Sequence, residues 1–109
     1  MEILHTETTE KLFRAILLLQ NTDECKSFFE DIFTVRELQD ISQRLQVACL
    51  LKEGKSYQTI SKDTGASTAT ISRVNRCLVY GGGGYAKILE RLEAQEKSDF
   101  NKTGTEVGQ

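Results

Sequence analysis

Hydroxyl and guanidinium side chains are concentrated in the stretch GASTATISRVNRCL, residues 65–78. The stretch contains four hydroxyl side chains and two arginines, and it has no acidic residue. Short side chains allow a helix to approach a surface closely, their hydroxyl groups can bond bases or phosphates, and arginine can bond phosphate oxygens. Since a solvated surface helix normally carries Glu and Lys, this composition indicates a helix that faces a polyanion.

The side chains expected to touch DNA fall into two groups. The basic group, expected on the phosphates, is Lys62, Arg73 and Arg76. The other group, expected to face the groove, is Ser67, Thr68, Ala69, Thr70 and Ser72. A simpler alternative stays open, in which Ser67 and Thr68 only cap a helix and Thr70 is only solvated.

Two short helices joined by a turn are predicted to position these side chains. Ser56 can cap a helix of about eight residues, Gly65 suits a turn with a positive φ, and Ser67 can cap the next helix. The residues at the expected core positions are Ile60, Ala66, Ile71 and Val74. We therefore predict a helix-turn-helix over about residues 56–78, although many two-helix corners bind no DNA.

A long helix precedes this motif and has the clearest local signals in the chain. Thr34 and Glu37 have the S/T-x-x-E spacing of a capping box, and apolar residues then recur at helical spacing until Gly54. The sequence therefore predicts a helix that begins after Thr34 and ends before Gly54.

The remaining helices are predicted less sharply. A first helix is expected over Thr9–Gln20, and a short helix capped by Thr22 follows it. We interpret the tetraglycine at 81–84 as a hinge before a last helix. The first helix is apolar nearly all the way round, which favours an interface with a second chain; a central core helix in a monomer is the alternative.

Length and composition indicate one soluble all-α domain. The chain has 109 residues, no proline and 28% charged residues. We expect a single helical DNA-binding domain at residues 1–97 and a disordered tail at 98–109, where the sequence is polar and aperiodic. The longest apolar run, AILLL, is far too short to cross a bilayer. We therefore expect no signal peptide and no membrane segment, and we expect a cytoplasmic location.

Charge is distributed unevenly along the chain. The formal net charge is −2, but residues 43–76 contain six basic and two acidic residues, which gives this stretch +4. A basic middle on an acidic chain is typical of a protein with one face on phosphate.

The single His5 and three well-separated cysteines show no metal-ligand spacing, and no nucleophile is paired with a base. We expect no enzyme activity, no metal and no bound cofactor.

From about Phe33 to Glu93 the chain resembles the Trp repressor superfamily, and within it the YerC/YecD-type proteins of Gram-positive bacteria. The resemblance rests on FTVRELQDISQRLQVACLLKEGKS leading into the helix-turn-helix, then GASTATISRVNRCL, a short loop and a terminal helix. It implies six helices per chain and an intertwined homodimer whose first helices interlock, which would account for the apolar LFRAILLLQ.

The resemblance also implies a ligand slot. Arg44 and Arg73 match the two arginines that sandwich the tryptophan indole in the Trp repressor, and Thr34 matches the residue near its carboxylate and amino groups. Two positions depart from that pattern: Val74 stands where the repressor has glycine, and Cys77 stands where it has serine. We therefore expect that tryptophan is not the ligand, while another small-molecule corepressor stays open.

Each of these ligand candidates has a simpler explanation. Thr34 is sufficiently explained as a helix cap, Arg73 as a phosphate contact, and Arg44 as a partner for Asp40 one turn earlier. The leading interpretation is a homodimeric, sequence-specific transcriptional regulator, a repressor that binds double-stranded DNA at a pseudo-palindromic operator. The alternative is a dimeric helical protein-interaction module that has lost DNA binding.

Overall fold

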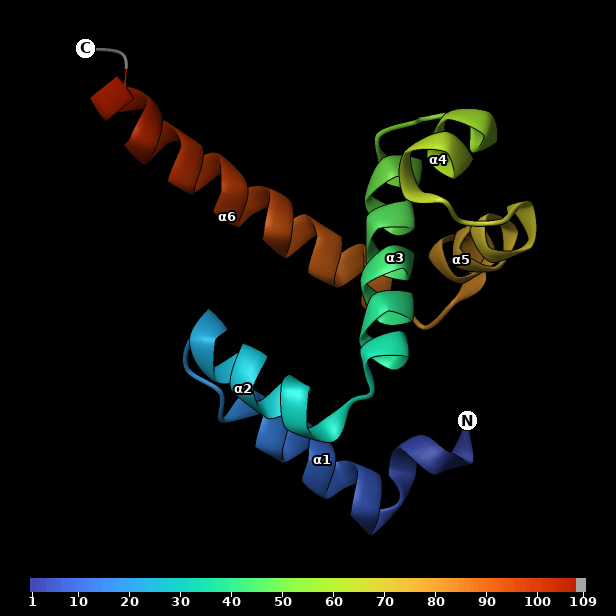
Figure 1. The fold of residues 1–109 in the computed structure, drawn as a ribbon, viewed down its shortest axis with the longest axis vertical. Helices are drawn as coiled ribbons and strands as arrows, with labels where there is room; N and C mark the ends of the chain where they lie inside the picture. The colour runs from blue at the N-terminus through green and yellow to red at the C-terminus, as the bar shows by residue number, and fades with distance from the viewer. Residues whose placement is uncertain (108–109) are drawn as a thin grey trace. The chain divides into compact units, whose positions relative to one another are not determined.

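The computed structural model describes the backbone of residues 1–107 and the side chains of residues 1–101. Within that part of the chain a short 3-10 helix is followed by six α-helices, and no strand occurs (Figure 1). The helices are η1 Glu2–His5, α1 Glu7–Leu17, α2 Thr22–Ile32, α3 Val35–Lys52, α4 Tyr57–Thr64, α5 Thr68–Tyr80 and α6 Gly84–Val107. The predicted all-α fold with six helices is therefore confirmed.

The chain divides into two compact units, of which the first comprises Met1–Asp40. Its helices begin at side-chain caps: the Thr6 hydroxyl accepts from the Thr9 amide, and the Asn21 side chain accepts from the Glu24 amide at 2.9 Å. The predicted starts at Thr9 and at a Thr22 cap were therefore slightly wrong, because the cap lies three positions earlier in the first case, at Thr6, and one position earlier in the second, at Asn21.

No residue of the first unit is buried in the single chain. Apolar side chains such as Leu17 and Leu18 are instead 82% and 76% exposed. Apolar side chains that stay in water leave the folded chain less stable than it would be if they were buried, since burial of apolar area is the main favourable contribution to folding. The first unit thus carries apolar surface that its own residues leave uncovered.

Helix α3 begins at the predicted capping box. The Thr34 hydroxyl accepts from the Glu37 amide at 3.1 Å, and the Glu37 carboxylate accepts from the Thr34 amide at 2.9 Å. Two of the amide groups that a helix start leaves without partners are thereby satisfied. The helix ends at Lys52, and Gly54 follows with φ +84°, so both predicted ends are confirmed.

The second unit, which begins at Ile41, contains the buried core. In Figure 1, α4 and α5 lie on one side of α3, and α6 departs from the other side. The core residues come from α3, the helix-turn-helix and α6: they are Val47, Ala48, Ile60, Ala66, Ile71, Val74 and Leu89. All four residues predicted at helix-turn-helix core positions are buried.

The helix-turn-helix has the predicted caps and turn. Ser56 caps α4, and Ser67 caps α5. Gly65 lies between them with φ +76°, a left-handed conformation that costs little only for glycine. Helix α5 continues to Tyr80, two residues beyond the predicted end of the motif.

The glycine segment 81–84 separates α5 from α6. A Cβ atom on Gly81 would lie 2.3 Å from the Cys77 carbonyl oxygen, so no larger residue fits this helix end without displacement. Helix α6 begins at Gly84 and its helical backbone extends to Val107, past Ser98, where the sequence predicted a tail to start. Residues 108–109 of that predicted tail lie outside the described part of the chain.

Helix α6 is attached to α3 by apolar packing and one ion pair. Leu89 is buried in the core, and Leu92 packs against it. The Lys52 ammonium group lies 3.2 Å from the Glu93 carboxylate, and Lys97 lies 3.3 Å from the same carboxylate. These two lysines lower the pKa of Glu93 below its ordinary value.

Candidate nucleic-acid interface

The N-terminal end of α5 presents short polar side chains. Ser67, Thr68 and Ala69 are exposed, and Thr70 is half-buried. The Ser67 hydroxyl accepts from the Thr70 amide at 3.1 Å and lies at the same distance from the Thr70 hydroxyl. Ser67 therefore does cap the helix, while Thr68 and Ala69 leave this end accessible to a surface that approaches it.

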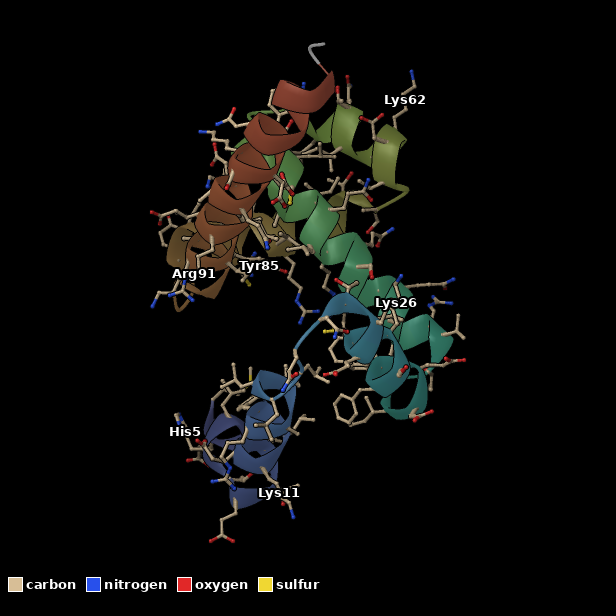
Figure 2. All side chains as sticks on the ribbon, turned by 90° about the vertical axis from the view of Figure 1, so that its left-hand side faces the viewer. His5, Lys11, Lys26, Lys62, Tyr85 and Arg91 are labelled. Atoms are coloured by element: carbon tan, nitrogen blue, oxygen red, sulfur yellow. The ribbon has the colours of Figure 1, made fainter. Side chains whose placement is uncertain are left out.

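The predicted basic contacts are all exposed on the two helices of the motif. Arg73 and Arg76 are exposed on α5, and Lys62 is exposed on α4, where Figure 2 shows it standing out from the helix. Within residues 1–101, none of these three side chains forms an ion pair. Their charges are thus available for phosphate, and no acidic side chain on α5 opposes them.

Two residues of α4 that the sequence analysis did not assign to DNA binding lie at the same surface, and one of them, Tyr57, was expected on the core side of the helix but is 37% exposed. A hollow of about 400 Å³ is lined by Tyr57, Gln58, Ser61, Lys62 and Thr68. Tyr57 and Gln58 are the first two residues of α4 after its cap, where backbone amides and the positive end of the helix dipole favour an anion. Their position directly after Ser56 was the signal that could have identified them.

A second hollow lies among α3, α5, α6 and the glycine segment. It has a volume of about 520 Å³ and is lined by Ile41, Arg44, Leu45, Cys77, Gly81, Gly82, Gly84, Tyr85 and Ile88. Figure 2 shows Tyr85 near the start of α6. The fold thus brings together two of the five ligand candidates, Arg44 and Cys77, at an apolar hollow with one guanidinium group.

The other three ligand candidates lie elsewhere. Arg73 is exposed and does not line this hollow. Val74 is 2% exposed and belongs to the core, so its side chain fills space between the helices instead of facing the hollow. Thr34 belongs to the first unit, where it caps α3. The ion pair suggested for Arg44 was wrong, because Asp40 pairs with Arg36 at 3.5 Å.

The cysteines differ in their surroundings. Cys77 is exposed, whereas Cys25 and Cys49 are half-buried. Burial, with the Glu96 and Glu53 charges nearby, raises the pKa of the Cys49 thiol and keeps it protonated. Among the described residues, no group of three His, Cys, Asp or Glu side chains could hold a metal ion, and no helix is long and apolar enough to cross a membrane.

Comparison with known proteins agrees with this arrangement. Residues 7–93 match the family model of the Trp repressor protein. The chain is 46% identical over 99 residues to the uncharacterized protein YerC of Bacillus subtilis (strain 168), an alignment that covers 91% of this chain and 95% of YerC.

Two solved structures share the fold. A TrpR-like protein from Eubacterium eligens ATCC 27750 superposes with a TM-score of 0.82 at 50% identity and covers 85% of this chain and 96% of its own. A protein from Staphylococcus aureus, described as a candidate Trp repressor, gives a TM-score of 0.81 at 51% identity and covers 84% and 92%. This chain belongs to the Trp repressor family, a family of DNA-binding regulators that are not enzymes.

Proposed function

We propose that this protein is a transcriptional repressor that binds a pseudo-palindromic operator as a homodimer. The observation that carries the proposal is the surface of α5: its exposed residues include two arginines without ion pairs, and the helix contains no acidic residue. Short hydroxyl and methyl groups at the start of α5 would contact base edges, and Lys62, Arg73 and Arg76 would contact phosphates.

The apolar surface of the first unit supports the homodimer. None of residues 1–40 is buried in the single chain, and exposed leucines such as Leu17 and Leu18 need a covering surface. A second copy of the same chain would supply one, as in obligate dimers whose folded state depends on association. The two copies of α5 in such a dimer would lie about 34 Å apart, one turn of DNA.

We further propose that an effector, where one acts, binds in the 520 Å³ hollow. Arg44 would pair with a negative group of that effector, and the apolar lining would hold a hydrophobic part. Tryptophan is not the ligand we propose, because Arg73, the second of the two arginines expected to sandwich an indole, does not line the hollow.

DNA selection tests the proposed function. The full-length chain would be incubated with a random double-stranded library, and the DNA retained over several rounds would be sequenced. We expect a two-fold symmetric motif with half-sites about 10 base pairs apart, and an affinity that falls at least tenfold between roughly 50 and 200 mM salt. A chain that enriches no motif, with an affinity insensitive to salt, would instead be an interaction module that has lost DNA binding.

A further inference from the structure

The turn that precedes α5 is held by side-chain hydrogen bonds. Ser61 donates its hydroxyl to the Ala66 carbonyl at 2.8 Å. The Thr64 hydroxyl accepts from the Ala66 amide at 3.1 Å and donates to the Ile60 carbonyl at 2.7 Å. Both Ser61 and Thr64 belong to α4, so these bonds fix the turn only relative to the helix that it leaves.

Gln43 ties the same turn to a different helix. Its side-chain Nε2 donates to the Thr64 carbonyl at 3.1 Å, a half-buried contact between residues 21 positions apart. Over residues 1–101, no other side chain of α3 makes a hydrogen bond to α4, α5 or their turn. The amide also packs near Gly65, since a Cβ atom built there would lie 4.0 Å from Nε2.

The Thr64 carbonyl needs such a partner because of its position. The last four carbonyl groups of an α-helix have no intrahelical amide to accept from, and Thr64 is the last residue of α4. Without Gln43 this half-buried oxygen would depend on water, and the turn would lose its hydrogen bond to α3. Ser67, the cap of α5, comes only three residues after Thr64.

We propose that Gln43 is a positioning residue for sequence readout: it fixes the turn at Thr64 and thereby the placement of the start of α5 in the groove. This inference rests on the proposed function. Hydrogen bonds to base edges tolerate displacements of only about 0.5 Å, whereas attraction to phosphates falls off slowly with distance. Loss of the Gln43 contact therefore weakens binding to the preferred site more than binding to random DNA.

The test compares two glutamines of α3. Gln43→Met keeps the length of the side chain and removes the donor. Gln46→Met is the matched control, because Gln46 is exposed on the same helix and makes no hydrogen bond in the described structure. Each variant is titrated with the DNA site that the unaltered chain selects and with a shuffled sequence of the same composition.

We expect Gln43→Met to lower the ratio of specific to random affinity about fivefold, the effect of about one lost hydrogen bond, with random affinity within about twofold of the unaltered chain. Gln46→Met should leave the ratio unchanged. Amide exchange of Gly65 and Ala66 should become faster in Gln43→Met alone. A retained ratio, or an equal loss on both DNAs, would overturn the inference even if the variant is less stable.

A second variant covers the case in which Gln43→Met does not fold. Gln43→Glu keeps the size and polarity of the side chain, but its ionised carboxylate cannot donate to the Thr64 carbonyl. The same fall in the ratio is expected. If the unaltered chain selects no DNA site, the proposed function and this inference are both overturned. If the unaltered chain selects a site and Gln43→Glu keeps the same ratio of specific to random affinity, only the inference is overturned.

Discussion

At the scale of single residues, α5 separates side chains by what they can contact. Arg73 and Arg76 are long, exposed and without ion pairs, so they suit phosphates at variable distance. Thr68 and Thr70 are short and lie in the first turn, so they suit contacts at fixed geometry with base edges. Mutations in the two groups should therefore have different effects on DNA binding.

Substitution of Arg76 should weaken binding without regard to sequence. Arg76→Ala is expected to lower affinity for specific and random DNA by a similar factor and to reduce the salt slope by about one phosphate contact. Fluorescence anisotropy at several salt concentrations measures both quantities. Arg91→Ala removes the same charge from α6, where Arg91 is exposed, and should leave both unchanged.

Substitution of Thr70 should act on preference instead. Thr70→Ala removes a hydroxyl but keeps the backbone amide that Ser67 caps, so the helix start is retained. We expect the difference in binding free energy between specific and random DNA to shrink by about 1 to 3 kcal/mol, the amount typical of one base contact. Binding to random DNA should change little. An equal loss of preference in Thr70→Ala and Arg76→Ala would show that the contacts are assigned wrongly.

Tryptophan should not act as a corepressor of this protein. Val74 is 2% exposed in the core, and Cys77 offers a thiol where the repressor offers a hydroxyl. An indole inserted between Arg44 and Arg73 would have to displace the packed Val74, at a cost of about 1 to 3 kcal/mol, roughly a ten- to hundredfold loss of affinity. Calorimetry and operator binding with and without tryptophan decide the matter. Micromolar affinity coupled to tighter DNA binding would refute the prediction.

At the scale of elements, α3 connects the parts of the candidate site. Arg44 from this helix lines the hollow shared with α5 and α6, and the neighbouring Gln43 reaches the turn of the helix-turn-helix. Successive residues of an α-helix point about 100° apart, so adjacent positions serve different neighbours. The start of this helix depends on Glu37, whose pKa is lowered mainly by the hydrogen bond that its carboxylate accepts from the Thr34 amide.

The lowered pKa of Glu37 predicts a dependence of stability on pH. A carboxyl group with a lowered pKa in the folded state stabilises that state above its ordinary value of 4.5, and the contribution is lost as the pH falls through the lowered pKa. Glu37→Gln should therefore be less stable than the unaltered chain near neutral pH, with a gap that closes as the pH falls below 4.5 and through the lowered pKa of Glu37. Urea unfolding from pH 7 to pH 3 measures this gap.

The control for this prediction is Glu90→Gln, which changes an exposed carboxylate on α6. The pH dependence of its stability should follow that of the unaltered chain. Glu37 is itself exposed, so the effect will be modest and smaller in high salt. A gap between Glu37→Gln and the unaltered chain that stayed constant from pH 7 to pH 3 would argue against the ionised capping box.

At the scale of the whole molecule, buried residues occur only in the second unit of the described chain. A chain of 109 residues buries a limited fraction of its surface alone, and residues 1–40 contribute no fully buried side chain. Association through this apolar surface would add the missing burial. The proposed repressor activity depends on such association, since a palindromic operator requires two copies of α5.

The unaltered chain should therefore be a dimer at micromolar concentration. Sedimentation equilibrium is expected to give twice the 12.3 kDa mass of one chain. Leu17→Glu places a charge on an exposed apolar position of α1 and should shift the equilibrium to monomer, whereas Lys11→Glu on the same helix should not. A monomeric unaltered chain with an ordered α1 would rule out this part of the proposal.

The sequence by itself determined the features that depend on neighbours in the chain. The Thr34–Glu37 capping box involves residues three positions apart, and the helix-turn-helix core follows the helical period around a glycine turn. Such signals are local, so they can be identified without knowledge of the packing. Even here the exact cap was ambiguous where several capping residues lie close together, as with Asn21 and Thr22.

Only the tertiary structure decided which distant side chains meet. It placed Arg44 with Cys77 at one hollow, put Val74 in the core, and brought Gln43 to the Thr64 carbonyl. Each of these outcomes depends on the crossing of α3 with the helix-turn-helix, which is set by the fit of many side chains together. The helical period of the sequence indicates which residues share a face of a helix. The packing of the core determines which other residues that face contacts.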